Sequence, residues 1–230
     1  MSLSIVILAA GKGTRMKSAM DKVMHPLASR PLLQHVIDTA KMLLPHQLSV
    51  VAGNGADQVL PFIESNQVDA VIQEQQLGTG HAVMQAISAI EKTEQVLVLY
   101  GDVPLTRSET LQQLIDVTSK QGLGILTTKL DDPTGYGRIV RNDADDVICI
   151  TEQKDADEAT KAIKEVNSGI MLLPSQWLIS SLDKLGNNNA QGEYYLTDMV
   201  ALAVEDGLHI ATVCCEDNAE VAGVNTRQQL

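Results

Sequence analysis

The stretch SIVILAAGKGTRM, residues 4–16, decides the fold of this chain. Its first half is a short apolar run rich in β-branched side chains, which predicts a buried parallel strand. The run then opens into small residues, two glycines and basic side chains. Glycine lets backbone N–H groups approach an anion closely, and the cationic side chains neutralise its charge. The stretch therefore predicts a phosphate-binding turn at the end of a first strand.

Two well-known phosphate-binding loops do not match this turn. The Walker pattern requires four residues between its first glycine and Gly-Lys-Ser/Thr, which Gly11 and Gly13 do not provide. The dinucleotide fingerprint requires a third glycine, where this chain has Met16, and an acidic residue after the second strand, where residues 53–55 are Gly-Asn-Gly. A dinucleotide-dependent dehydrogenase is therefore disfavoured, and a plain tight turn remains the alternative to a phosphate site.

Composition limits the class of protein. The 230 residues suffice for one α/β domain, and 44% of them are hydrophobic, which is typical of a globular chain. The formal net charge of −12 argues against a nucleic-acid-binding surface. No apolar run is long enough to span a membrane and no leader precedes the first strand, so we expect a cytoplasmic protein without membrane or nucleic-acid partners.

The three cysteines, Cys149, Cys214 and Cys215, form neither a disulfide framework nor a metal-binding pattern. Cys214 and Cys215 lie in an apolar, strand-like run. Free cysteine behaves as a small hydrophobic residue, so we expect both to lie in the core.

Strands and helices alternate up to about residue 105, which predicts a parallel, doubly wound sheet. The later part is more antiparallel in character, with short strands around turns. We expect strands at 4–9, 47–52, 69–73, 95–100, 124–130, 139–141, 147–151, 166–173 and 209–215, and helices at 31–44, 54–65, 81–91, after 106, at 174–185 and at 195–205. The fold class is thus α/β, a Rossmann-like, mostly parallel sheet flanked by helices with a smaller antiparallel region.

Two further loops follow predicted strands, at the edge where open α/β sheets bind ligands. One contains Gly78 and Thr79 and leads into a helix that starts near His81, which we weigh as a general base against a structural role. The other follows the almost wholly apolar, and therefore central, strand 95–100 and contains Asp102, a carboxylate suited to Mg²⁺. Thr106 fits a capping box for the next helix, which leaves Asp102 for chemistry.

Several segments together resemble the nucleotide-sugar pyrophosphorylases. They are LAAGKGTRM (8–16), DKV (21–23), QLGTGHA (76–82), YGDVPL (100–105), DDPTGYGRI (131–139), EQKD (152–155), VNSGI (166–170), NNNAQGEYYLTD (187–198) and GVN (223–225). The segments QLGTGHA, DDPTGYGRI and NNNAQGEYYLTD are most similar to the family members that act on N-acetylglucosamine 1-phosphate. In those members the domain is the N-terminal half of a bifunctional bacterial enzyme of cell-envelope precursor synthesis. The resemblance spans essentially the whole chain and implies one nucleotidyltransferase domain over residues 1–230.

This resemblance implies an Mg²⁺-assisted reaction in which N-acetylglucosamine 1-phosphate attacks the α-phosphorus of UTP and pyrophosphate leaves. Such a displacement needs alignment and charge neutralisation rather than a protein nucleophile, and the chain offers no convincing nucleophile–base pair. The implied site comprises Arg15 and Lys22 as catalytic residues; Leu8, Ala10, Gly11, Gly13, Gln73, Gly78 and Thr79 for the nucleotide; Tyr100, Gly101, Gly137, Glu152 and Asn167 for the sugar; and Asp102 and Asn225 for the metal.

The chain departs from the family pattern at Asp21, where proline is usual, and at Ala222, where an acidic residue is common. An added carboxylate beside Lys22 could point to solvent or weaken the phosphate site. Longer family members continue into a left-handed β-helix with acetyltransferase activity, which forms a trimer. This chain stops at Leu230, so we expect no acetyl transfer and a monomer. A pyrophosphorylase for another sugar, such as glucose 1-phosphate, and a non-catalytic nucleotide-binding module remain the alternatives.

Overall fold

The computed structural model describes residues 2–11, 13–53 and 57–230. Lys12 of the glycine-rich turn and residues 54–56, the expected start of the second helix, lie outside the described residues. The strands are β1 Leu3–Ala9, β2 Pro26–Leu27, β3 Arg30–Pro31, β4 Gln47–Gly53, β5 Asp69–Gln73, β6 Gln95–Tyr100, β7 Leu123–Lys129, β8 Arg138–Arg141, β9 Val147–Thr151, β10 Glu165–Pro174 and β11 Ile210–Cys215. The α-helices are α1 Leu32–Met42, α2 Val59–Ser65, α3 Thr79–Gln85, α4 Ile87–Ile90, α5 Ser108–Val117, α6 Glu158–Lys161, α7 Ser175–Leu182 and α8 Asp198–Glu205, and the 3₁₀ turns are η1 Thr14–Met16, η2 Lys22–Met24 and η3 Asn218–Val221.

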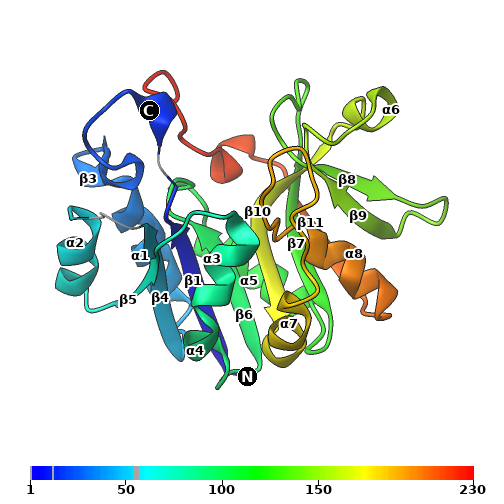
Figure 1. The fold of residues 1–230 in the computed structure, drawn as a ribbon, viewed down its shortest axis with the longest axis horizontal. Coiled ribbons are helices and arrows are strands. Elements are labelled where there is room, and N and C mark those ends of the chain that lie inside the picture. The colour runs from blue at the N-terminus through cyan, green and yellow to red at the C-terminus, as the bar shows by residue number, and fades with distance from the viewer. Residues whose placement is uncertain (1, 12, 54–56) are drawn as a thin grey trace.

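The main sheet has the strand order β11-β7-β10-β6-β1-β4-β5 (Figure 1). The pairs β6–β1, β1–β4, β4–β5 and β7–β11 are parallel, whereas β10 runs antiparallel to both β6 and β7. The hairpin β8–β9 branches from β10 and forms the smaller antiparallel region. The predicted fold class is therefore confirmed, and the apolar strand β6 is central as expected.

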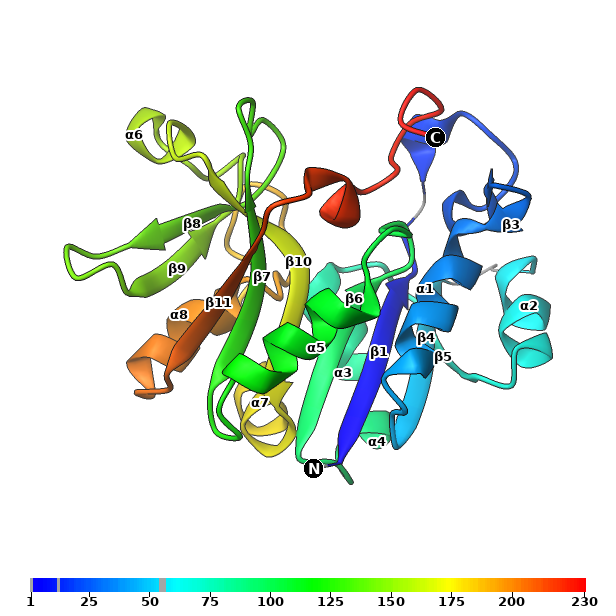
Figure 2. The ribbon, with the colours of Figure 1, turned by 180° about the vertical axis from the view of Figure 1, so that it is seen from behind.

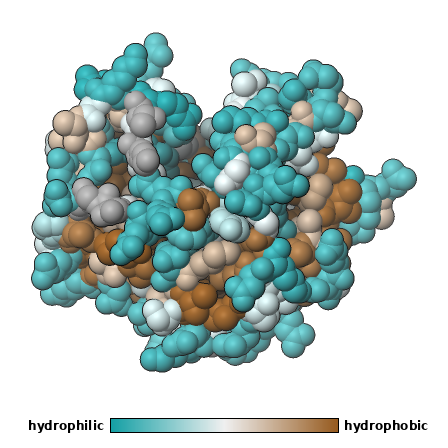
Figure 3. Space-filling view, viewed as in Figure 1, coloured by the Kyte–Doolittle hydropathy of each residue, from teal (hydrophilic) through white to brown (hydrophobic). Residues whose placement is uncertain are grey.

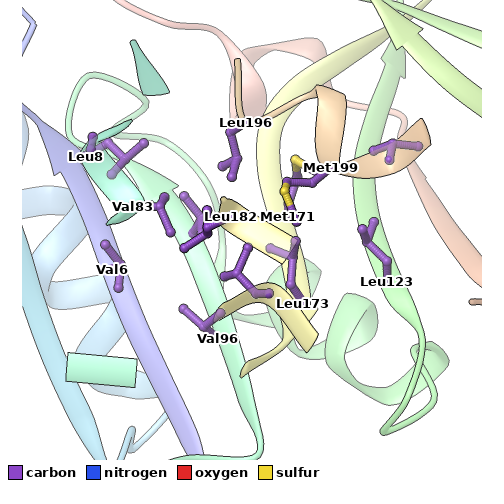
Figure 4. Packing of buried hydrophobic residues seen from close by; sticks show 14 of the residues in the cluster. Val6, Leu8, Val83, Val96, Leu123, Met171, Leu173, Leu182, Leu196 and Met199 are labelled. Carbon is purple, nitrogen blue, oxygen red and sulfur yellow. The ribbon is translucent and has the colours of Figure 1, made fainter. Parts of the chain in front are cut away.

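Helices cover both faces of the sheet and enclose two apolar layers. Helices α1, α2 and α5 pack on one face, which Figure 2 shows from the front, and α3, α4, α7 and α8 pack on the other. Strand β1 contributes to both layers by simple alternation: Ile5 and Ile7 point into the first, Val6 and Leu8 into the second (Figure 4). This two-sided burial explains why the strand reads as a continuous apolar run.

The capping box predicted at Thr106 is wrong. Helix α5 begins at Ser108, and Arg107 in the N-cap position makes no side-chain capping bond. The Thr106 hydroxyl instead donates to the backbone oxygen of Glu220, 2.8 Å away. The Glu220 carboxylate accepts from the Arg107 backbone N–H at 3.1 Å and from the Thr110 hydroxyl at 2.7 Å. A residue far along the chain, from η3, therefore satisfies the free donors at the start of α5.

Other element boundaries differ by a few residues. The expected helix 81–91 begins earlier, at Thr79, and is interrupted at Ala86 between α3 and α4. The expected helix 195–205 begins only at Asp198. Cys215 is buried as expected, but Cys214 is exposed because neighbouring side chains on β11 point to opposite faces.

The parallel strands β1, β4, β5 and β6 present their carboxyl ends at one edge of the sheet, where Figure 3 shows the surface hollowed between the two halves of the molecule. The segment after β11 crosses this edge and returns to the turn that follows β1 (Figures 1 and 2). None of the helices among the described residues has the length and hydrophobicity needed to cross a bilayer.

Candidate active site

Two adjoining cavities lie at this edge. The first, of about 560 Å³, is formed by the carboxyl ends of β1, β5 and β6 and by the start of α3. The second, of about 250 Å³, lies between the end of β6 and the β8–β10 region. They share the wall residues Thr79, Tyr100, Asp102, Glu193 and Asn225. One ligand could therefore extend from one cavity into the other past Asp102 and Asn225.

The first cavity is lined by most of the residues that the resemblance assigns to the nucleotide: Leu8, Ala10, Gly11, Gln73, Gly78 and Thr79. Gly13 does not line it. At this position φ is +57°, and an added Cβ would lie 2.7 Å from the Cβ of Lys22. Glycine is thus required at position 13 so that the turn after β1 can pack against the residue carrying the ammonium group.

The loop that opens α3 is held by a distant segment. The Thr79 hydroxyl accepts from the backbone N–H of Leu196 at 3.0 Å, and the Gly80 N–H donates to the oxygen of Tyr194 at 2.8 Å. Gly78 has φ +113°, and an added Cβ would lie 2.6 Å from the oxygen of Tyr194. The segments QLGTGHA and NNNAQGEYYLTD, separate in the sequence, therefore form one wall of the cavity.

Charged and polar groups converge where the cavities meet. The Lys22 ammonium donates to Asp102 in an ion pair and lies 3.3 Å from Oδ1 of Asn225. Arg15 donates from its guanidinium to the same Asn225 oxygen at 2.8 Å. The turn after β1, the end of β6 and the C-terminal segment thus bring two cationic side chains together with the side-chain oxygens of Asp102 and Asn225. Arg15 lines neither cavity but borders them through Asn225.

The oxygens of Asp102 and Asn225 fit the requirements of Mg²⁺. Both are hard donors, and both already face a cationic group, the Lys22 ammonium. The described residues contain no group of three or more His, Cys, Asp or Glu side chains placed to hold a metal. A Mg²⁺ site needs one or two carboxylates, because substrate phosphates and water complete its shell.

The second cavity is lined by Tyr100, Gly137, Glu152 and Asn167, four of the five positions that the resemblance assigns to the sugar. The fifth, Gly101, lines neither cavity. A Cβ added to Gly101 would lie 3.1 Å from Val23 and 3.3 Å from Leu33, so this residue faces the apolar layer. Its backbone N–H donates to the oxygen of Leu8 at 2.9 Å, which fixes the end of β6 against β1.

Burial shifts the ionisation of two lining residues. Desolvation raises the pKa of Glu152, although a hydrogen bond from the Thr197 hydroxyl, 3.0 Å away, counteracts it. Desolvation, with the negative charges of Glu152 and Asp102, also raises the pKa of Tyr100. The Tyr100 hydroxyl therefore stays protonated at neutral pH and can donate a hydrogen bond.

A fully buried arginine positions the rim of the second cavity. Arg138 is 1% exposed. Its guanidinium donates to the backbone oxygen of Tyr136, to Oε1 of Gln153 at 2.7 Å and to the backbone oxygen of Lys161 at 3.4 Å. Gln153 Oε1 also accepts from the N–H of Gly135 at 3.2 Å. The turn 135–137 is thereby tied to the segment after β9.

Two polar residues, Gln76 and Glu193, are among the cleft residues that sequence reasoning missed. Gln76 lines the first cavity and donates from Nε2 to the backbone oxygen of Ala10, and Glu193 lies in the shared wall. Both belong to motifs quoted for the resemblance, so a closer consideration of those motifs would have found them. His81 lines neither cavity. Its Nδ1 lies 3.0 Å from Nε2 of Gln73, which gives it a structural contact rather than the position of a base.

Asp21, which replaces the usual proline, does not pair with its neighbour Lys22, whose partner is Asp102. Its backbone N–H donates to Oε1 of Gln58 at 3.4 Å, and burial together with the charge of Asp57 raises its pKa. This carboxylate therefore lies within the electrostatic influence of Asp57, before α2, rather than in an ion pair with Lys22. Ala222 immediately follows η3 and lines neither cavity.

The chain is similar to curated proteins and to solved structures over its full length. It is 56% identical over 230 residues to the bifunctional protein GlmU of Pseudomonas entomophila and 54% identical over 228 residues to that of Paraburkholderia phymatum. These alignments cover 100% and 99% of this chain but 50% of each relative, so the chain spans about half the length of the curated relatives it matches.

Two solved structures share the fold. The inositol-1-phosphate CTP transferase from T. maritima has a TM-score of 0.77 at 15% identity, covering 100% of this chain and 91% of that one. A UDP-glucose pyrophosphorylase complexed with UDP-glucose has a TM-score of 0.73 at 16% identity, covering 92% and 90%. The model of the MobA-like NTP transferase domain matches residues 5–181. The chain therefore belongs to the MobA-like NTP transferase domain family.

Proposed function

We propose that this chain transfers the uridylyl group of UTP to N-acetylglucosamine 1-phosphate, releasing pyrophosphate and forming UDP-N-acetylglucosamine. The observation that carries the proposal is the position of Asp102 and Asn225 in the wall shared by the two cavities, in contact with Lys22. A nucleotide in the first cavity and a sugar phosphate in the second would meet at this cluster of charges.

The residues suit a reaction that depends on alignment and electrostatics. In-line displacement at phosphorus needs the two substrates to be held close and the charge on the phosphate oxygens to be stabilised. In our proposal Lys22 and Arg15 stabilise that charge and the departing pyrophosphate. Leu8, Ala10, Gly11, Gln73, Gly78 and Thr79 bind the nucleotide, and Tyr100, Gly137, Glu152 and Asn167 form the sugar side. Gly13 packs the turn after β1, and Gly101 fixes the end of β6 against β1.

Asp102 and Asn225 would hold Mg²⁺ together with substrate phosphates. When bound, the ion would supply Lewis-acid stabilisation of negative charge on the phosphoryl oxygens. Lys22 contacts the side chains of both Asp102 and Asn225, so its ammonium group would lie close to the same phosphates. The cluster would therefore contribute to binding both the metal and the nucleotide.

The choice of sugar rests on the relatives. The proteins 54–56% identical to this chain are named GlmU, and the motifs QLGTGHA, DDPTGYGRI and NNNAQGEYYLTD are similar to those of the members that act on N-acetylglucosamine 1-phosphate. This similarity disfavours a glucose 1-phosphate enzyme. The charged cluster at the joined cavities disfavours a binding module without catalysis.

The decisive experiment measures pyrophosphate release from UTP, with N-acetylglucosamine 1-phosphate or glucose 1-phosphate, with and without Mg²⁺. We expect release that requires both the acetylated sugar phosphate and the metal. Release with glucose 1-phosphate but not with N-acetylglucosamine 1-phosphate would support the reaction type and overturn the proposed sugar substrate. No release with either sugar would overturn the proposed activity.

A further inference from the structure

Gln73 lines the first cavity, and its side-chain nitrogen is held by a backbone oxygen. It ends the edge strand β5, and its side chain is 3% exposed. Its Nε2 donates to the backbone oxygen of Gly78 at 3.1 Å. A carbonyl oxygen can only accept, so this contact assigns the nitrogen of the carboxamide to the side facing the protein.

The same nitrogen has a second partner, His81. Nδ1 of His81 lies 3.0 Å from Nε2 of Gln73. Because that nitrogen is a donor, Nδ1 must be the acceptor, and the neutral imidazole carries its proton on Nε2. The ring is held in place by α3 and by the neighbouring ring of Tyr194, whose centroid lies 6.4 Å away.

Both N–H groups of the carboxamide are thus directed at protein acceptors, so a ligand in the cavity meets the remaining acceptor, Oε1. We propose that His81 is a positioning residue that fixes the Gln73 carboxamide in this orientation and thereby makes the site select a pyrimidine with an N–H donor at N3. The inference rests on the proposed function, in which the first cavity binds the base of the nucleotide.

The selectivity follows from hydrogen-bond polarity. Uracil carries a proton on N3 and can donate to Oε1, whereas cytosine presents a bare acceptor at N3 that faces the same oxygen without a proton between them. A site built to accept a hydrogen bond rejects the analogue that lacks the donor, because its own polar atom is left unpaired. Turning the carboxamide over would bring Oε1 against the oxygen of Gly78 and the bare Nδ1 of His81.

The test compares UTP with CTP in three variants. His81→Leu removes the acceptor with a side chain of similar size, and His81→Asn returns an acceptor near the position of Nδ1. Gln85→Ala removes a further neighbour of the imidazole on the exposed face of α3, whose side-chain nitrogen lies 3.4 Å from Nε2 of His81. With the proton on Nε2 of His81 both nitrogens are donors, so Gln85 donates instead to the backbone oxygen of His81, 3.4 Å away. We measure kcat/KM for UTP and CTP with N-acetylglucosamine 1-phosphate, and the Kd of UDP and CDP by calorimetry.

We expect His81→Leu to lower the UTP/CTP ratio about tenfold, the loss that accompanies one net hydrogen bond. His81→Asn should recover most of the ratio, and Gln85→Ala should leave it unchanged. An unchanged ratio in folded His81→Leu, or an equal loss in Gln85→Ala, would overturn the inference. If His81→Leu fails to fold, His81→Ala supplies the same comparison. Absence of wild-type turnover with any nucleotide would instead overturn the proposed function, and the UDP/CDP affinity ratio would still judge His81.

Discussion

Asn225 connects the two basic side chains of the site through one oxygen atom. Its Oδ1 accepts from Arg15 at 2.8 Å and lies 3.3 Å from the Lys22 ammonium. Arg15 is therefore oriented before substrate arrives, which is the condition under which a cation stabilises developing charge most effectively.

We accordingly expect Arg15→Ala to lower kcat by about 10²–10³-fold, the usual loss when one preorganised charge-stabilising donor is removed. Arg227→Ala is the matched control, because this exposed arginine donates to the backbone oxygen of Lys17 at 3.5 Å and lines neither cavity. Steady-state pyrophosphate release measures both variants. Near-normal turnover of Arg15→Ala would refute the role proposed for it.

The buried carboxylate of Glu152 should make the binding of the sugar phosphate depend on pH. Burial raises its pKa, so its carboxylate becomes protonated at a higher pH than an ordinary glutamate as the pH falls. A protonated carboxyl loses acceptor capacity for sugar hydroxyls, so the KM for N-acetylglucosamine 1-phosphate should rise as the pH falls through this raised pKa. The raised pKa also means that ionised Glu152 lowers the free energy of unfolding at pH values above its pKa in the folded protein. This loss is absent at pH values below its pKa in the unfolded chain.

Glu152→Gln should show an elevated KM, by about tenfold, that no longer rises as the pH falls, since it mimics the protonated state. Glu158→Gln, on the exposed helix α6, is the control and should follow the wild-type profile. Initial rates at varied sugar phosphate and saturating UTP measure these constants. A wild-type profile in Glu152→Gln would assign the pH dependence to another group.

The short motifs that carry the resemblance contain many of the residues that line the two cavities, with glycines, strand-terminal carboxylates and basic turns close together. What they could not predict is pairing across the chain. Lys22 and Asp102 are 80 positions apart, and Arg15 and Asn225 are 210 apart. The structural contact of His81 was likewise invisible, because it depends on the side-chain position of Gln73 at the end of another element.

At the scale of elements, the start of α3 is shaped by one glycine. A Cβ at Gly78 would meet the backbone of Tyr194, and φ is +113°. We expect Gly78→Ala to lower the free energy of unfolding by at least about 1–2 kcal/mol and, by displacing the loop, to reduce kcat/KM for UTP by about 10- to 100-fold.

Gly207→Ala is the control that separates backbone strain from the steric contact of the added Cβ. Gly207 follows α8, has φ +75° and has no atom within 4 Å of an added Cβ, so its replacement introduces backbone strain without a steric contact. It should lose about 1–2 kcal/mol in urea unfolding and keep the wild-type kcat/KM for UTP. If Gly78→Ala also keeps that value, the loop contact with Tyr194 is irrelevant to nucleotide binding.

Periodicity predicted the strands of the main sheet and most helices, because burial on one or two faces leaves a regular apolar pattern, but it missed the two-residue strands β2 and β3. Helix starts were less predictable. The hydrogen-bond donors at the start of α5 are satisfied by Glu220, about a hundred residues away, and no local pattern encodes such a partner. The local pattern therefore predicted Thr106 as the cap, whereas the Thr106 hydroxyl donates to the backbone oxygen of Glu220 and the Glu220 carboxylate accepts hydrogen bonds at the start of α5.

In the whole molecule, the sheet joins the two cavities into one cleft. Strand β10, antiparallel to both neighbours, connects the parallel half to the β8–β9 hairpin, and the C-terminal segment returns Asn225 to the first turn. The alternation of strands and helices predicted the parallel half, and the turn-rich later part predicted the antiparallel one. The way the two halves meet could not be predicted from patterns, because it depends on the sheet order.

This architecture predicts that a ligand spanning both cavities stabilises the whole fold. UDP-N-acetylglucosamine with Mg²⁺, at about a hundred times its Kd, should raise Tm by about 5–10 °C, since such saturation adds about 2.7 kcal/mol to the free energy of unfolding of a domain this size. At equal concentration UMP or the sugar phosphate alone should give smaller shifts, because each occupies one cavity. Asp102→Ala should abolish the additional shift that Mg²⁺ gives, whereas Asp183→Ala, exposed after α7, should retain it. Scanning calorimetry at matched ligand concentrations measures these shifts, and equal shifts from UMP and from UDP-N-acetylglucosamine would mean that the two cavities do not act as one site.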